Sequence, residues 1–324
     1  MGKSIIFRLL TVTAIASIVL VYFSPIWWVS LKAPNYPPEA FPDGVRIHFH
    51  VDGVFNGCQK RESEEIHEEE ALNCVHEMDT INHYVGMYPI ASGGPIERTL
   101  SQFLFAFMIV MLVAFMMSGR KFQATTLTVG FSIIVVWAYI TLFTPGGVTW
   151  MSEGYQQVLQ TSMDMEREEF QDWSGFHAMQ KNYQDTLGMY FRDTVKIQKR
   201  ADILTIAAYV VIGLLIASML IFIIGILWKN RLFYWLLVII PILLPAFFVL
   251  EYAGWLWWFG HNLNEMGAFT LKPFMPTVFG DGKVAQFTTH SYPHYGFGLM
   301  MLSLVLLLLA SLLRRKQLWE ANKD

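Results

Sequence analysis

The chain has 324 residues, of which 54% are hydrophobic and only 15% are charged, with a formal net charge of −3. A soluble domain carries about 25% charged residues, so the composition excludes an ordinary soluble domain. The charged residues gather in a few segments, and the apolar runs between them reach roughly 20 residues, which is long enough for a helix to cross a bilayer. No basic stripe is interleaved with aromatic residues, which argues against a nucleic-acid-binding protein.

Six apolar stretches have the length and composition of transmembrane helices. They cover residues 5–23, 100–117, 125–143, 203–228, 232–250 and 297–313. The first ends in bulky residues where a signal peptide would carry small ones, so we expect it to remain as a span. The fifth contains Pro241 and Pro245, which predict a kink.

Basic residues mark four places between and beside these stretches. They are Lys3 with Arg8, Arg120 with Lys121, Lys229 with Arg231, and the Arg314-Arg315-Lys316 run. In a six-helix arrangement all four places lie on one side of the membrane, and the positive-inside rule assigns that side to the cytoplasm. We therefore predict a multi-pass protein of a bacterial inner (cytoplasmic) membrane, with both termini cytoplasmic and the large connections in the periplasm.

The expected fold class is an all-α polytopic membrane protein of about six transmembrane helices with three large external segments, the first of them partly β. The chain divides into a first span (1–23), an external segment (24–98), the second and third spans (99–143), an external helical segment (144–202), the fourth and fifth spans (203–250), an external aromatic and histidine-rich segment (251–296), and the sixth span with a basic tail (297–324). The β prediction rests on the alternation over 45–51, which ends at a turn signal, Asp52-Gly53.

The two cysteines, Cys58 and Cys74, both fall in the first external segment. An oxidising compartment favours a disulfide between them, worth about 3 kcal/mol for a loop of about 15 residues. The alternative is a pair of thiolate ligands for a metal. The glutamate-rich run at 62–70 lies between them and is typical of a solvated face, or of a weak site for hard cations.

Residues 74–87 hold the densest group of candidate metal ligands: His76, Met78, His83 and Met87. Imidazoles and thioethers suit copper, and thioethers favour Cu(I) in particular. On a helix, His83 and Met87 would share one face, while His76 and Met78 would share a face only on a strand. The alternative is that the methionines fill gaps in a core and the histidines lie on the surface.

Other histidines extend this metal hypothesis. His48 and His50 share one face of the predicted strand and could chelate a metal, although a polar strand face explains them equally well. In the third external segment His261, His290 and His294 lie beside the ends of spans, near an aromatic shelf of Trp255, Trp257 and Trp258. We predict that His83, Met87, His261, His290 and His294 converge on one copper site above the bilayer. Glu251, near the same interface, can pair with a basic residue or line an opening.

Several blocks of sequence resemble a known group of proteins. They are Trp27-Trp28 with A-P-N-Y-P at 33–37, I-N-H-Y-V-G-M at 81–87, G-H-N-L at 260–263 and T-H-S-Y-P at 289–293. These blocks are similar to poorly characterised multi-spanning bacterial membrane proteins associated with copper handling and with nitrous-oxide-reductase gene neighbourhoods. The resemblance implies a role in copper handling and does not specify a mechanism.

The sequence therefore predicts a membrane-anchored accessory protein that holds or delivers copper on the periplasmic face for a cuproenzyme. Two alternatives stay open: a membrane electron-transfer component that binds haem or quinone near the aromatic shelf, or a structural subunit of a larger membrane complex. No phosphate-binding glycine loop, H-E-x-x-H, G-x-S-x-G or C-x-x-C-H motif is present, so no enzyme class is indicated.

Overall fold

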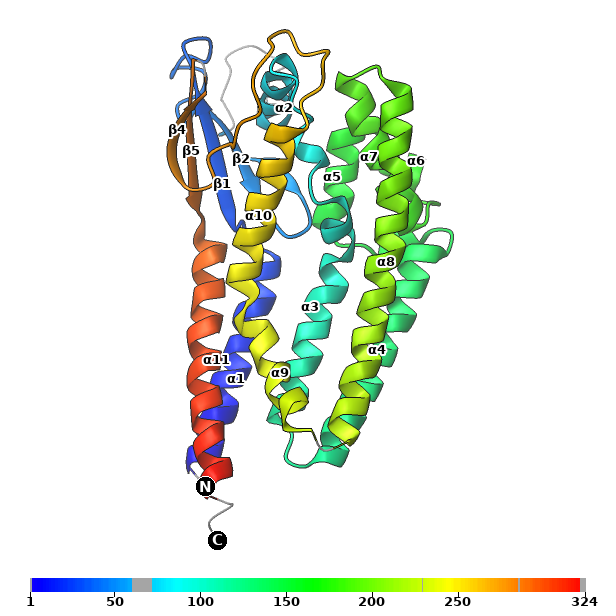
Figure 1. Cartoon of the computed structure of the whole chain (residues 1–324), viewed down its shortest axis with the longest axis vertical. Helices are drawn as coiled ribbons and strands as arrows, with labels where there is room; N and C mark the ends of the chain where they lie inside the picture. The colour runs from blue at the N-terminus through cyan, green and yellow to red at the C-terminus, as the bar shows by residue number, and fades with distance from the viewer. Residues whose placement is uncertain (1, 60–71, 229, 285, 321–324) are drawn as a thin grey trace.

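The structure is a computed structural model that describes residues 2–59, 72–228, 230–284 and 286–320. The glutamate-rich run at 62–70 lies outside the described residues. A long bundle of helices carries, at one end, a smaller layer of strands and short helices (Figure 1).

Five of the described helices are long and apolar enough to cross a membrane. They are α1 (Gly2–Tyr22), α3 (Pro95–Met116), α4 (Arg120–Phe143), α8 (Thr194–Leu227) and α11 (Tyr295–Glu320). A sixth span results if α9 (Arg231–Ile242) and α10 (Leu244–His261) count as one bent helix. The prediction of about six spans is thus supported in part, because five or six helices of the described chain could span a membrane.

The break between α9 and α10 confirms the predicted kink. The two helices are bent by 57° at Leu243. Pro241 lies inside α9, and Pro245 lies in the first turn of α10. Because proline has no N–H and its ring clashes with the carbonyl four residues earlier, the helix cannot continue straight through this stretch.

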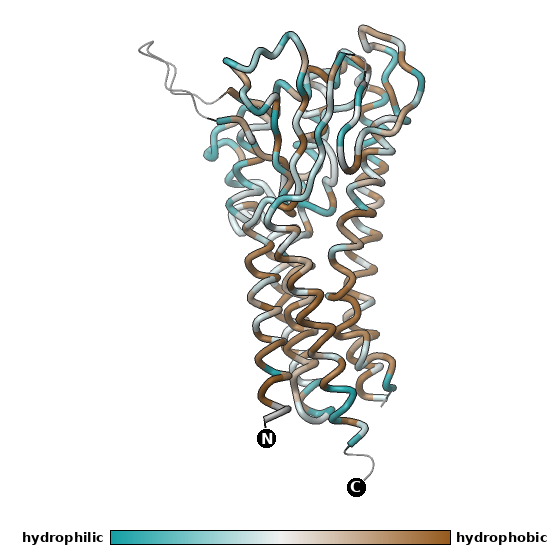
Figure 2. The backbone as a smooth tube through the Cα atoms, turned by 90° about the vertical axis from the view of Figure 1, so that its left-hand side faces the viewer, coloured by the Kyte–Doolittle hydropathy of each residue, from teal (hydrophilic) through white to brown (hydrophobic). Residues whose placement is uncertain are grey.

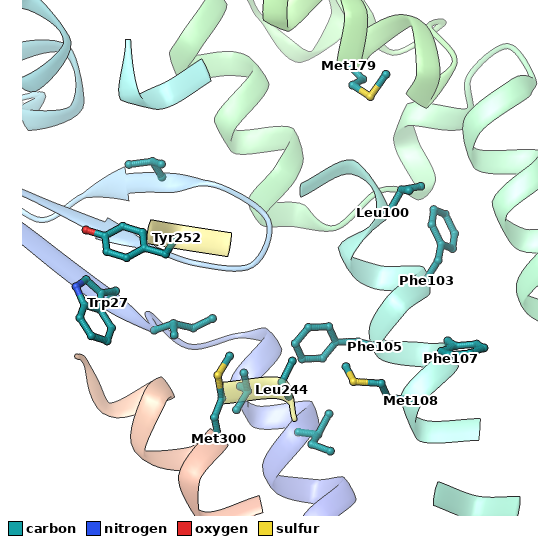
Figure 3. Close-up of a cluster of buried hydrophobic side chains, with 14 of the residues drawn as sticks. Trp27, Leu100, Phe103, Phe105, Phe107, Met108, Met179, Leu244, Tyr252 and Met300 are labelled. Atoms are coloured by element: carbon teal, nitrogen blue, oxygen red, sulfur yellow. The ribbon is translucent and has the colours of Figure 1, made fainter. Parts of the chain in front are cut away.

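The bundle is held together by aromatic and aliphatic side chains. Phe7 on α1 packs edge-on against Phe115 on α3, with ring centroids 5.3 Å apart, and Phe107 stacks on Phe131 of α4 at 5.0 Å. Figure 3 shows Phe103, Phe105 and Phe107 projecting from α3 within this core. The outer surface of the bundle is also apolar, because Ile206 and Leu214 of α8 are 66% and 65% exposed. Apolar residues inside and outside are expected of helices surrounded by lipid, and Figure 2 shows the apolar colour running along the bundle.

A five-stranded antiparallel sheet stands at the other end, in the order β3-β2-β1-β5-β4. The strands are β1 (Trp27–Lys32), β2 (Val45–Phe49), β3 (Val54–Asn56), β4 (Gly280–Val284) and β5 (Phe287–Pro293). The predicted strand at 45–51 is confirmed as β2. The prediction that confined β structure to the first large segment is wrong, because β4 and β5 come from the third large segment and complete the same sheet. The strands β1 and β5 are neighbours in this sheet. β1 follows α1 along the chain, and β5 leads into α11.

The two faces of the sheet differ in composition, because alternate residues of a strand point to opposite sides. Val29, Val45 and Ile47 are buried on the inner face. The outer face carries Trp28 and His48, which are paired across β1 and β2.

Short helices complete this end of the molecule. They are α2 (Cys74–Tyr84), α5 (Glu153–Met163), α6 (Arg167–Phe170) and α7 (Gly175–Tyr190). The segment predicted to be helical at 144–202 is helical, and its Met163 and Met179 are buried as packing residues. We call the sheet together with these four helices the head. We call the opposite end, where α1 begins and α11 ends, the basic end (Figure 1).

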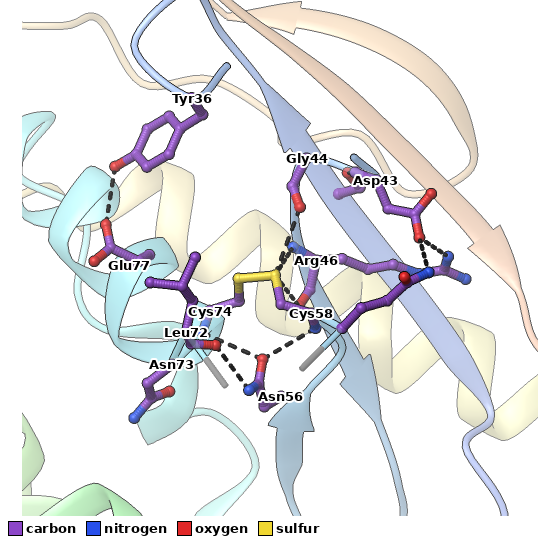
Figure 4. Close-up of a disulfide and its surroundings, with 12 residues drawn as sticks. Tyr36, Asp43, Gly44, Arg46, Asn56, Cys58, Leu72, Asn73, Cys74 and Glu77 are labelled. Atoms are coloured by element: carbon purple, nitrogen blue, oxygen red, sulfur yellow. Dashed lines mark hydrogen bonds and ion pairs between the residues drawn. A yellow bond between two sulfur atoms is a disulfide. The ribbon is translucent and has the colours of Figure 1, made fainter. Parts of the chain in front are cut away.

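A disulfide between Cys58 and Cys74 fastens the sheet to α2 (Figure 4), with the two Cα atoms 6.0 Å apart. Asn56 supports it, because its side-chain oxygen accepts hydrogen bonds from the backbone N–H groups of Cys58 (3.0 Å) and Cys74 (3.2 Å). The predicted disulfide is confirmed, and the alternative of two thiolate ligands is wrong.

Candidate functional site

The residues around His76 and Met78 form a helix, not a strand. Asn73 caps α2 by accepting a hydrogen bond from the backbone N–H of His76 at 3.2 Å. On a helix, positions i and i+2 point in nearly opposite directions. His76 is therefore exposed, while Met78 is 2% exposed in the core. The predicted shared face of these two residues is wrong.

His83 and Met87 do not share a helical face either. The helix α2 ends at Tyr84, and Gly86 turns the chain with a φ of +75°. Met87 is 7% exposed and lines a cavity of about 70 Å³ behind the sheet, together with Met78. His83 packs on the ring of Phe191, with centroids 5.0 Å apart.

Four of the candidate histidines have a local hydrogen-bond partner. Their ring Nδ1 atoms pair as follows: His76 with the Tyr190 hydroxyl at 2.9 Å, His261 with the Trp257 carbonyl at 2.8 Å, His290 with the Asp281 carboxylate at 2.6 Å, and His294 with the Tyr295 backbone N–H at 2.9 Å. His261 also stacks on Trp257 at 4.5 Å. Within the part of the chain that the structure describes, no three His, Cys, Asp or Glu side chains form a group that could hold a metal ion. The described geometry thus gives no support to a convergent site.

The two sequence blocks at 81–87 and 260–263 meet in a different way. The loop after α10 docks on the loop after α2, because the Asn264 N–H donates to the Gly86 carbonyl at 2.6 Å and the Phe269 N–H donates to the Tyr84 carbonyl at 3.1 Å. A Cβ on Gly86 would lie 2.4 Å from the Asn264 carbonyl oxygen. Glycine is therefore required at position 86 by the close approach and by the positive φ.

Buried charged groups lie where the head meets the bundle. Arg98 is 6% exposed and Asp52 is 5% exposed. Arg98 interacts electrostatically with Asp52, Glu97 and Glu251. Buried ionisable groups near a bilayer are costly and typically mark a functional site. The sequence analysis singled out Glu251 as lining an opening or pairing with a basic residue, but it missed Arg98 and Asp52.

The carboxylates of Glu97 and Glu251 gather around the start of α3. A methyl group placed on Gly94, the N-cap residue of α3, would lie 3.6 Å from Oε1 of Glu251 and 3.8 Å from Oε2 of Glu97. The Arg98 Nε donates to the Gly94 carbonyl at 3.4 Å. Arg98 Nη1 and Glu97 Oε2 are both buried, and neither has a hydrogen-bond partner among the described residues.

Asp52 ties this cluster to the head. The Ser152 hydroxyl donates to its carboxylate at 2.8 Å. Burial raises the pKa of Asp52, while the bond from Ser152 and the charge of Arg98 act in the opposite direction. A Cβ on Gly154 would lie 2.5 Å from the carboxylate, so the first turn of α5 fits closely over it. Asp52 is therefore held in place by the head and is not free to approach a ligand.

A cavity of about 140 Å³ adjoins the buried charges, and we call it the junction cavity. Its polar lining residues are His50, Glu97, Arg98, Ser101, Glu251 and Tyr252, and the other walls are largely apolar and aromatic, including Leu244, Phe105, Phe247, Phe248 and Trp255. Burial lowers the pKa of His50 to about 4, so its imidazole is uncharged at neutral pH. The cavity thus offers hydrogen-bond donors and acceptors at one end and apolar surface elsewhere, as small-molecule sites usually do.

The fold and this cavity define a helical protein with membrane-spanning character and a buried polar site between its bundle and its head. No protein-family model, curated protein or solved structure matches the chain.

Proposed function

We propose that the protein binds the ring of a membrane quinone or quinol in the junction cavity, as a component of membrane electron transfer. The observation that carries this proposal is the pair of unpartnered buried atoms, Arg98 Nη1 and Glu97 Oε2, at the polar end of a cavity whose other walls are largely apolar. A buried polar atom without a partner costs about 1–3 kcal/mol, and more when it is charged. A ligand that satisfies both atoms would recover that free energy.

The charges restrict the chemistry of the ligand. Arg98 offers a donor, so the ligand needs an acceptor oxygen; Glu97 offers an acceptor, so the ligand also needs a hydroxyl. A fatty acid or a phosphate would place a second negative charge beside the carboxylate of Glu97, and like charges repel. A quinol ring carries hydroxyl oxygens that both donate and accept, without a net charge. It therefore fits the polar end better than an anionic headgroup.

The size and position of the cavity agree with a ring whose tail remains in lipid. A volume of about 140 Å³ is well below that of a site for a whole drug-sized molecule, so only a headgroup would be enclosed. Phe247 lines the cavity and is itself 60% exposed on the apolar surface of the bundle. A tail leaving past this residue would reach the lipid. A carboxylate beside the ring is also the group that would take a proton from a bound quinol.

Titration of the purified full-length protein with a short-chain quinol, kept reduced under anaerobic conditions and read through tryptophan fluorescence, tests this proposal, because only the reduced ring has a hydroxyl to donate to Glu97 Oε2. Trp255 lines the cavity, so a bound quinol should quench its emission in a saturable way. We expect Glu97→Gln and Arg98→Gln each to weaken binding roughly 10- to 100-fold, because each removes a charged hydrogen-bonding group.

Arg192→Gln is the matched control, since Arg192 is exposed and does not line the cavity. Thermal unfolding of each variant establishes whether it is folded. If Arg98→Gln is not folded, the test depends on Glu97→Gln, which preserves the size of the side chain. Equal affinity in Glu97→Gln and the original protein, or no saturable quenching, would refute the proposal.

Copper binding is the second candidate function, and we propose it for a different set of histidines from the one predicted. On the outer face of the sheet the rings of His48 and His294 lie 5.1 Å apart, and Nε2 of His48 is buried with no partner among the described residues. Burial, with the charge of Arg46, lowers the pKa of His48 to about 4. Burial and Arg46 also lower the pKa of His294, which favours the neutral imidazole that ligates a metal.

The neighbouring charge favours an ion of low charge. Arg46 acts against a cation at this pair, although it also approaches Asp43 (3.6 Å) and lies over the Trp28 ring (4.3 Å). A monovalent ion meets less repulsion than a divalent one, and imidazole is a suitable ligand for copper. The pair would therefore serve Cu(I) in an accessory role for a cuproenzyme.

Measuring bound Cu(I) per folded protein tests this candidate. We expect His48→Ala and His294→Ala each to remove most of the copper, and the double variant to add little. His261→Ala is the control, because His261 stacks on Trp257 away from the pair. If only His261→Ala loses copper, the result supports the convergent site predicted from sequence and contradicts the His48–His294 pair. If the original protein binds no copper, the proposal of copper binding is refuted.

A further inference from the structure

A second cavity, of about 850 Å³, opens at the basic end of the bundle, far from the junction cavity. We infer that it binds an anionic phospholipid, with the phosphate among its arginines and the acyl chains along its apolar walls. The arginines that line it are Arg120, Arg231, Arg314 and Arg315. They come from the starts of α4 and α9 and from the last turns of α11.

The charge of this cavity is unbalanced. Among the described residues that line it, none is acidic. Arg120, Arg231 and Arg315 are exposed and form no salt bridge with a described acidic side chain. Four like charges around one opening repel one another, so an anion placed between them would be attracted by all four.

One arginine is already positioned by the protein. The Arg314 Nε donates to the Tyr234 hydroxyl at 2.7 Å, and its Nη1 donates to the Gln317 side chain at 3.3 Å. Its guanidinium also lies 5.3 Å from the centre of the Phe7 ring. A fixed guanidinium loses less side-chain entropy when it binds an anion, and its planar fork suits phosphate oxygens.

The apolar walls distinguish a lipid from a soluble phosphate. Ile239, Leu308 and Leu312 line the cavity and are 40%, 43% and 60% exposed. Trp235 and Trp319 line it as well, and tryptophan is enriched where a protein meets the membrane surface. A free phosphate gains nothing from these walls, whereas an acyl chain covers them. Basic pockets between transmembrane helices are known to hold anionic lipid headgroups.

Thermal unfolding of the full-length protein in mild detergent tests this inference. Added phosphatidylglycerol should raise the unfolding temperature in a saturable way, whereas phosphatidylcholine with the same chains and inorganic phosphate should not. We expect the triple variant Arg120→Gln, Arg231→Gln, Arg315→Gln to bind phosphatidylglycerol roughly 100-fold more weakly. The triple change to lysine should retain most of the affinity, and Arg314 is left unchanged because it packs in the fold.

A triple change at the head, Arg192→Gln, Lys199→Gln and Lys272→Gln, is the matched control, because it removes the same charge from exposed positions outside the cavity. It should leave the response to phosphatidylglycerol unchanged. Equal stabilisation by phosphatidylcholine would show binding without headgroup selection and would overturn the inference. So would equal protection by inorganic phosphate, or an unaltered response of the triple glutamine variant. Because the quinol titration concerns the other end of the molecule, the two proposals can fail separately.

Discussion

Replacing Asp79 with asparagine should remove from the free energy of unfolding a fall of ~4 kcal/mol between about pH 4 and 7. Asp79 is 3% exposed and accepts hydrogen bonds from the backbone N–H groups of Ile90 (2.6 Å) and Ala91 (3.4 Å). Burial outweighs these bonds and raises the pKa of Asp79 from 3.8 to about 7. The folded protein therefore keeps a proton that the unfolded chain releases.

The direction of the effect follows from that difference. Below pH 4 both states hold the proton, and the stability is greatest as far as this group is concerned. As the pH rises toward 7 the unfolded state is favoured, and the free energy of unfolding falls by ~4 kcal/mol. Above pH 7 both states are ionised and the loss is complete. Asparagine keeps the acceptor oxygen for Ile90 and Ala91 but carries no charge, so the variant should lack this fall, while the contributions of His48 and His50 are the same in both proteins.

Denaturant unfolding at intervals from pH 4 to 8 measures the difference. Asp164→Asn is a suitable control, because Asp164 is exposed at the end of α5 and its left-handed backbone (φ 53°) is compatible with asparagine. The control should follow the original protein. If Asp79→Asn also follows it, then Asp79 is ionised in the folded protein and the expected effect of its burial is wrong.

Removing the disulfide by changing Cys58 and Cys74 to serine should lower the free energy of unfolding by about 3 kcal/mol. The bond closes a loop between residues 16 positions apart and joins the sheet to the first residue of α2. Without it, the unfolded chain gains conformational freedom while Asn56 still holds the folded ends together. Denaturant unfolding measures the loss.

A reductant provides the internal control for this prediction. It should destabilise the original protein by a similar amount and leave the double serine variant unaffected. If the free energy of unfolding of the double serine variant lies within about 0.5 kcal/mol of that of the original protein, the predicted stabilisation by the disulfide is wrong. Binding of the quinol should persist in the double variant, because neither cysteine lines the junction cavity.

The parts of the fold that sequence predicts well depend on local patterns. Apolar length determines where spans can occur, and Pro241 and Pro245 determine where one of them bends. The disulfide was predictable because the chain has only two cysteines. The pairing of β1 with β5 was not, because Trp27 and Pro293 are opposite one another only in three dimensions. The sequence of β5 also lacks an alternation of apolar and polar residues, because its buried positions are Thr289 and Ser291.

The candidate sites were harder to predict because they depend on burial. Arg98 precedes an apolar run and has the appearance, in sequence, of an ordinary residue at a membrane surface. Only packing shows that its Nη1 is buried without a partner. The convergent copper site was predicted because its histidines adjoin the ends of spans and therefore lie at a similar depth relative to the membrane surface. Depth does not fix lateral position, and His261 and His290 have separate partners in the fold.

The pairing of β1 with β5 has a consequence for the biosynthesis of the protein. A ribosome delivers β1 directly after the first helix, but β5 emerges just before the last one, and the two strands are neighbours in the finished sheet. Until then one edge of β1 exposes backbone groups that can pair with another chain. Closure over so large a sequence separation is slow. The nascent protein thus passes through translation with an open strand edge, and a chain that stopped before residue 287 would keep that edge and be prone to aggregate.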